Sequence, residues 1–258
     1  MPEHATWLTL LLAHVKDTLD HNASVLGDSV VGDHPPSWAS FEPIAAALFV
    51  ALVVLLVAVR VRARLARADE AVIPEDRLTL RTFMETFLGY FYDLAKSVMG
   101  PDRAKRYFPL IGTSAAFVFF SNVLALVPGM PVATSHLGIT LGCALVVFVL
   151  FNIYGLMAQG GTYIKHLAGP VWWLAPLLFP LEVLSLCIRP VTLAVRLMVN
   201  MAADHVMLGL FLGLIALFVP LPVMLLGCLV VIVQTLVFTL LTCIYIGLAT
   251  EGHEEHAH

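Results

Sequence analysis

Long apolar runs dominate this 258-residue chain and limit what it can fold into. Hydrophobic residues make up 60% of the sequence and charged residues 12%, against about 45–50% and about 25% in an ordinary soluble domain. So few charges cannot cover the surface of a water-soluble globule of this size. The composition therefore excludes a disordered chain, argues against a soluble enzyme and predicts an all-α integral membrane protein.

The formal charges are unevenly distributed along the chain. Residues 1–42 hold six acids and one base, and residues 60–106 hold ten of the fourteen bases. Because basic residues mark the cytoplasmic side of membrane segments, this distribution predicts a multi-pass protein with its N-terminus outside and its C-terminus in the cytoplasm. The net charge of −4 gives no reason to expect a nucleic-acid partner.

Apolar runs of roughly 20 residues, the length that spans a bilayer, organise the sequence into a single membrane domain. We expect an outer segment over 1–42, about five membrane helices and one amphipathic helix on the cytoplasmic side. The amphipathic helix, 78–98, has apolar residues at three- and four-residue steps with charges between them; a helix docked on other helices would show the same pattern. The membrane helices are expected over 43–64, 107–127, 137–158, 171–219 and 222–250, followed by a tail over 251–258.

The last two apolar runs are longer than a single span needs. A helix of about 45 residues would reach roughly 65–70 Å, whereas the hydrocarbon core of a bilayer is about 30 Å thick. The run 171–219 must therefore break, with Pro176, Pro180 and Pro190 as candidate bend points, or lie steeply tilted.

The first of these long runs contains four formal charges: Glu182, Arg189, Arg196 and Asp204. A charge at the bilayer centre costs about 2.5–3.5 kcal/mol, so these side chains must face the protein interior or water. Glu182, Arg189 and Arg196 recur at intervals of seven, which places them within about 40° on one helical face. Thr192 and Asn200 extend this polar stripe.

Arg196 is the charge that is hardest to explain as part of a structural ion pair. A buried salt bridge is an open alternative for Glu182 with Arg189, but no acid lies three or four residues from Arg196 on its face. Gln234 is the strongly polar side chain that the last run offers at mid-depth, and an amide can bind a guanidinium without neutralising it. The pattern predicts a cation that meets a carboxylate from elsewhere, while His205 places a titratable group on roughly the opposite face.

Three stretches of the chain resemble subunit a of F-type ATP synthases, the stator subunit that carries protons to the rotating c-ring. They are RPVTLAVRLMVNMAADH over 189–205, FSNVLALVPG over 120–129, and QTLVF from Gln234 with Tyr245 further on. The similarity continues in order and spacing from about residue 40 to the end. It implies that the last two long elements form a tilted hairpin along the ring.

The same resemblance implies the partners and the setting of the chain. The partners would be the c-ring, the peripheral-stalk subunit b, the lipid bilayer and, indirectly, the F1 sector. We expect no cofactor, no bound metal and no catalytic activity of the chain on its own, because the sequence contains no Walker-type phosphate loop. We expect the chain in a bacterial inner membrane.

The resemblance also implies a role for each residue of the polar stripe. Arg196 would be the essential stator arginine that faces the ring carboxylates. Asn200 and Gln234 would line or support the same polar site. Glu182 would lie toward the cytoplasmic exit path.

The half-channel from the outer side would contain His205 and Asn122, and here the chain departs from the family. The family usually has glycine where this chain has Asp204, and many members carry an acid or a histidine where it has Gly227. We hypothesise that Asp204 supplies, from the neighbouring helix, the carboxylate that is missing at Gly227, and pairs with His205 or relays protons to it. The alternative is that Asp204 is an inert lining residue.

Other functions fit parts of the pattern. A secondary transporter could bind an anionic substrate at an intramembrane arginine, but such folds often contain repeated broken helices, and the intramembrane charges here lie in one run. A structural protein with buried ion pairs would leave Arg196 without a local acid. The terminal stretch EGHEEHAH over 251–258 could bind a metal, although a solvated tail is the simpler interpretation.

Overall fold

The computed structural model describes residues 42–65, 79–127, 136–160, 175–214 and 220–250, together with Met130 and Thr134. Each element in these ranges is an α-helix, which confirms the predicted all-α membrane fold. The expected outer segment and C-terminal tail, the predicted helix ends at 171–174 and 215–219, and the side chain of His205 lie outside the described residues.

The described helices are α3 (Glu42–Leu65), α5 (Leu80–Met99), α6 (Pro101–Ala125), α7 (Leu137–Gln159), α9 (Ala175–Leu214) and α10 (Pro220–Thr250). Among them, α3, α6, α7 and α10 are long and apolar enough to cross a membrane. With 40 residues, α9 is the longest described helix and is not one of these four, and it carries the four charges noted in the sequence.

A tight turn at Gly100 joins α5 to α6. Gly100 has a φ of +82°, a left-handed conformation that glycine adopts without steric cost, and Pro101 follows at the first helical position, where its missing N–H is no loss. The rings of Tyr92 and Phe108 then meet at 5.2 Å across the two helices. Because of this turn, α6 begins six residues before the apolar run expected to start at residue 107.

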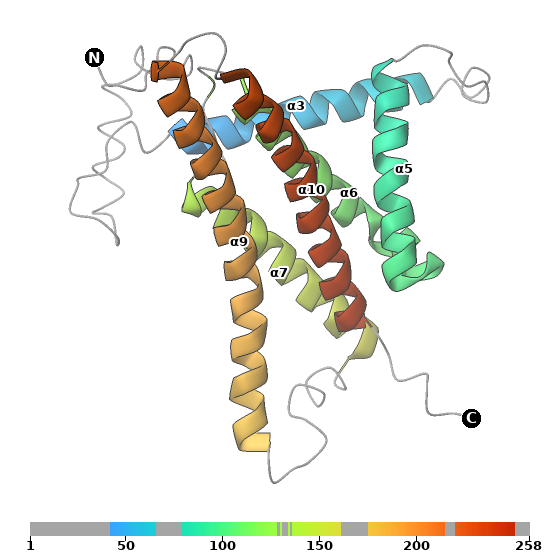
Figure 1. Cartoon of the computed structure of the whole chain (residues 1–258). Coiled ribbons are helices and arrows are strands. Elements are labelled where there is room, and N and C mark those ends of the chain that lie inside the picture. Colours follow the sequence, from blue (N-terminus) through green and yellow to red (C-terminus); the bar gives the residue numbers. More distant parts are fainter. Residues whose placement is uncertain are drawn as a thin grey trace, which may run out of the picture.

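The two longest helices, α9 and α10, run side by side in opposite directions and cross in front of α6 and α7 (Figure 1). Pro180 and Pro190 lie inside α9, which nevertheless continues as one helix. A helix of 40 residues is about 60 Å long, so a continuous α9 fits a bilayer core of about 30 Å only when steeply tilted. The bends considered at Pro180 and Pro190 therefore do not break the helix, and tilt is the alternative that the structure supports.

The core is formed where the α9–α10 pair packs on the other helices. Its largest fully buried side chains include Ile111, Phe151, Leu197 and Phe238, from α6, α7, α9 and α10. Helix α3 contributes no residue to this core, and only 11% of its most apolar window is buried. In Figure 1, α3 runs across the direction of α9 and α10 at the edge of the bundle.

Candidate functional site

The charged side chains of α9 lie in different surroundings. Glu182 and Arg189 are half-buried and Arg196 is exposed. Within the part of the chain that the structure describes, no ion pair joins Glu182 to Arg189. Instead, the Arg189 guanidinium lies 5.4 Å from the centre of the Tyr245 ring on α10, and the Thr192 hydroxyl donates to the Arg189 carbonyl at 2.9 Å. A cation–π contact therefore takes the place of the salt bridge that the sequence left open.

Arg196 lies on the outer face of the hairpin. Its neighbours Val195 and Val199 are 39% and 48% exposed, whereas Leu197 on the opposite side is completely buried. Among the described residues, Arg196 has neither an ion-pair partner nor a side-chain hydrogen bond. A guanidinium on an apolar outer face is costly in hydrocarbon, so this position requires water or an anionic group from outside the described chain.

Asn200 and Gln234 connect the two long helices one turn beyond Arg196. The Asn200 side-chain amide donates to Gln234 Oε1 at 2.8 Å, and Gln234 is 3% exposed. The bond uses one donor of Asn200 and the acceptor oxygen of Gln234 in an apolar setting, where an unpaired amide group would cost about 1–3 kcal/mol. The structure thus pairs Gln234 with Asn200 rather than with the Arg196 guanidinium.

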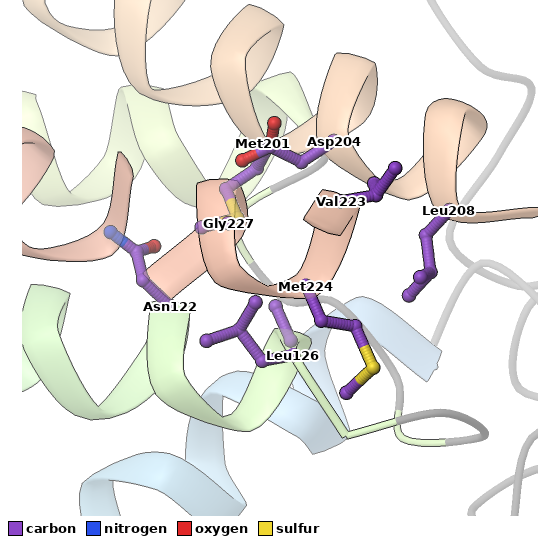
Figure 2. Close-up of a pocket in the computed structure, with 9 residues that line it drawn as sticks. Asn122, Leu126, Met201, Asp204, Leu208, Val223, Met224 and Gly227 are labelled. Atoms are coloured by element: carbon purple, nitrogen blue, oxygen red, sulfur yellow. The ribbon is translucent and has the colours of Figure 1, made fainter. Parts of the chain in front are cut away.

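Asn122 of α6, Asp204 of α9 and Gly227 of α10 line one small cavity (Figure 2). Its volume is about 20 Å³, which is room for about one water molecule. Asn122 is completely buried; its Oδ1 accepts a hydrogen bond from Thr134 Oγ1 at 3.2 Å. Its Nδ2, like Ser121 Oγ, has no partner among the described residues. Buried polar atoms left in this state favour a bound water or ion.

Gly227 is explained by the close approach of α10 to α6. A Cβ placed there would lie 2.6 Å from Leu126 Cδ2, closer than real contacts allow, so any side chain would displace Leu126. An acid or histidine at this position would therefore require a different arrangement of Leu126. Asp204 lines the same cavity, and its role in place of an acid at position 227 stays a prediction.

Asp204 also lines a second cavity on its other side. This cavity has a volume of about 250 Å³ and includes Asn200, Val233 and Gln234. Asp204 is therefore the one carboxylate, among the described residues, that borders both cavities. In spatial order, the polar groups run from Asn122 through Asp204 to the Asn200–Gln234 pair.

Among the predicted site residues on α9, Glu182, Arg189, Thr192 and Arg196 line neither cavity. Glu182 precedes Arg196 by fourteen residues on α9, about 21 Å along the helix axis. His205 lies in α9 next to Asp204, and its side chain is outside the described residues. No group of three potential metal ligands occurs among the residues that the structure describes.

Sequence reasoning missed Thr134 and Ser121. Thr134 is completely buried and bonds to Asn122 across twelve residues, a contact that no helical spacing predicts. Ser121 carried a weak signal, since it is the polar neighbour of Asn122 inside an apolar run.

The fold and the site define a class: multi-span helical membrane proteins with ionisable groups along an overlong helical hairpin. The chain belongs to the ATP synthase A chain family, which it matches over residues 44–247. This membership confirms the resemblance seen in the sequence.

Individual relatives agree with this assignment. The chain is 57% identical to the ATP synthase subunit a of Sorangium cellulosum (strain So ce56) over 256 residues, 99% of this chain and 100% of the relative. It is 44% identical to ATP synthase subunit a 1 of Syntrophotalea carbinolica over 69% of this chain and 74% of the relative. For the ATP synthase subunit a of Geobacter sulfurreducens, the identity is 41% over 69% and 76%.

Proposed function

We propose that this chain is the proton-translocating stator subunit of the ATP synthase Fo sector and exchanges protons with the carboxylates of a rotating c-ring. Family membership supports the assignment to this complex. The observation that carries the finer proposal is Arg196, an exposed cation on an apolar face without a partner among the described residues. A carboxylate that arrives and leaves with the ring would meet that need.

The mechanism follows from the cost of charge in hydrocarbon. A ring carboxylate is neutral while it faces lipid, because an unpaired charge there is expensive. Near Arg196, the positive charge favours the ionised form, and the proton leaves into one half-channel. The carboxylate passes the arginine and is reprotonated from the other half-channel. Arg196 also opposes direct passage of protons between the channels, because a fixed cation repels a proton.

The polar cluster supplies a candidate path from the outer side. Protons would pass from the cavity beside Asn122 to Asp204, with His205 as its neighbour on α9, and then to the ring near Asn200. The Asn200–Gln234 pair would hold the polar site open between the two helices. Each charge that crosses gains about 2.3 kcal/mol per 100 mV of membrane potential, and half-channels offset around the ring would convert that gain into rotation.

The remaining predicted residues would act away from this cluster. Glu182 would lie on the cytoplasmic exit path, about 21 Å along α9 from Arg196. Arg189 and Thr192 would form a secondary polar stripe that fixes α9 to α10. The single membrane domain would have its N-terminus outside and its C-terminus in the cytoplasm, with subunit b as a further partner and the F1 sector coupled indirectly.

Disulfide cross-linking tests the face that this proposal assigns to the ring. A cysteine at Val199, which is 48% exposed, should cross-link to a cysteine placed next to the membrane carboxylate of a ring subunit in the assembled complex. A cysteine at Leu197, which is completely buried, is the matched control and should not. Cross-linking from Leu197 but not from Val199 would contradict the proposal.

A further inference from the structure

A groove between α3, α5 and α6 shares no residue with the cavities around Asp204. Its volume is about 420 Å³. Val54, Val61, Leu88 and Phe108 form much of its apolar wall, and Arg62 is its only formal charge. A large apolar groove with a single cation requires an occupant of matching chemistry.

Small side chains on α6 leave this space open. Gly112, Thr113 and Ala116 line the groove from that side. The Thr113 hydroxyl donates to the Pro109 carbonyl at 2.6 Å, so its hydrogen is used within its own helix. The side chains of the three helices leave a volume of about 420 Å³ between them, so the described chain does not fill the groove itself.

Arg62 lies at the end of the apolar span Pro43–Ala63. It is exposed and has no ion-pair partner among the described residues. The end of a span is the depth at which lipid headgroups lie. A guanidinium there can bind two phosphate oxygens in its planar fork, and basic pockets between membrane helices attract anionic headgroups.

We propose that this groove holds one acyl chain of an anionic phospholipid, whose phosphate is bound by Arg62. An anionic phospholipid matches both features of the groove, because it has an anionic end for Arg62 and an apolar chain for the apolar wall. A helix of a partner subunit is the competing occupant that the tests below distinguish.

Native mass spectrometry of the purified, intact complex tests the headgroup contact. The complex is exchanged into detergent that contains equal amounts of phosphatidylglycerol and phosphatidylcholine, and the lipids retained are counted. Arg62→Gln should lower the preference for phosphatidylglycerol about fivefold, the effect of about 1 kcal/mol per basic residue at a membrane surface. Arg60→Gln is the control, because Arg60 is also exposed but does not line the groove.

A second variant tests the acyl-chain site. Ala58 is exposed and lines the groove, so Ala58→Phe should fill the space without disturbing the fold and should remove the retained lipid whatever its headgroup. Val59→Phe, on the exposed surface outside the groove, should retain it. Equal lipid preference in Arg62→Gln and Arg60→Gln, unchanged retention in Ala58→Phe, or loss of a partner subunit in place of lipid would overturn the proposal. The outcome does not depend on the proton path.

Discussion

At the residue scale, Arg196 and Asp204 share a helix but have different surroundings. They are eight residues apart, which is about 12 Å along the axis and about 80° around it. Arg196 is consequently directed to the outer face, while Asp204 borders the two cavities between α9 and the neighbouring helices. Among the described residues, no ion pair joins the two side chains.

Asp204 should be required for fast proton transfer. Asp204→Asn keeps the shape of the side chain but removes the group that can gain and lose a proton. We expect ATP-driven proton pumping to fall about tenfold or more, since a positioned proton-transfer group typically contributes about 10²–10⁴-fold. Pumping is followed by fluorescence quenching in inverted membrane vesicles.

The control for this variant is Asp102→Asn, which removes an exposed carboxylate in the first turn of α6 and should pump normally. Near-normal pumping by Asp204→Asn would make Asp204 an inert lining residue.

Even the smallest side chain at position 227 should lower the stability of the protein. Gly227→Ala brings a Cβ to 2.6 Å from Leu126 Cδ2, so Leu126 must move at a cost of about 1 kcal/mol. The midpoint of detergent-induced unfolding should fall, and the double variant Gly227→Ala/Leu126→Ala should regain the loss attributable to that clash. Gly142→Ala, where a Cβ meets nothing within 4 Å, provides the control. A stability loss that is the same with and without Leu126→Ala would refute the clash.

At the scale of the elements, two contacts hold α9 to α10 at matching heights. Arg189 lies over Tyr245, and Asn200 bonds to Gln234. From the first pair to the second, α9 advances by as many residues as α10 goes back. This is expected of antiparallel helices that keep a constant register. The hairpin is therefore held at two points on either side of the depth of Arg196.

The ring of Tyr245 should contribute more to the stability of the α9–α10 hairpin than its hydroxyl does. Tyr245→Leu removes the cation–π contact and should destabilise the hairpin by about 0.5–2 kcal/mol, seen as a lower unfolding midpoint. Tyr245→Phe retains a ring beneath Arg189 and should remain close to the wild type. Equal losses in the two variants would assign the effect to the hydroxyl.

Sequence periodicity predicted helices but not how they meet. Apolar runs located α3, α7 and α10 to within a few residues, because runs of that length have few other structures in a membrane. The start of α6 was misplaced because its charged first turn, 101–106, has no apolar signal. Proline was a poor guide in α9, where Pro180 and Pro190 lie within a continuous helix.

The candidate site could be proposed from its charged residues, but most of its contacts could not be predicted. The charges in α9 were conspicuous because each is expensive in an apolar run. The pairing of Asn200 with Gln234 spans 34 residues, and the glycine at 227 reflects the nearby Leu126 on another helix. Both depend on how α9 and α10 pack against each other and against α6, which one sequence does not encode in any local pattern.

At the scale of the whole molecule, the basic residues should define one side of the membrane. Arg60 at the end of α3 and Lys105 in the first turns of α6 are both exposed. Cysteines at these two positions, in a background without the four native cysteines, should react with a membrane-impermeant thiol reagent in inverted vesicles. In right-side-out vesicles both should be protected. Labelling of the two cysteines from opposite sides would contradict the predicted topology.

The most direct test of the whole account is ATP-driven proton pumping by a complex that carries Arg196→Ala. The complex should assemble with its ring, because Arg196 is exposed and bonds to no described residue, and coupled pumping should be abolished. Arg189→Ala, which removes a half-buried arginine of the same helix, should lose stability but keep coupled pumping. Coupled pumping by the assembled Arg196→Ala complex would contradict the role of Arg196 as the partner of the ring carboxylates.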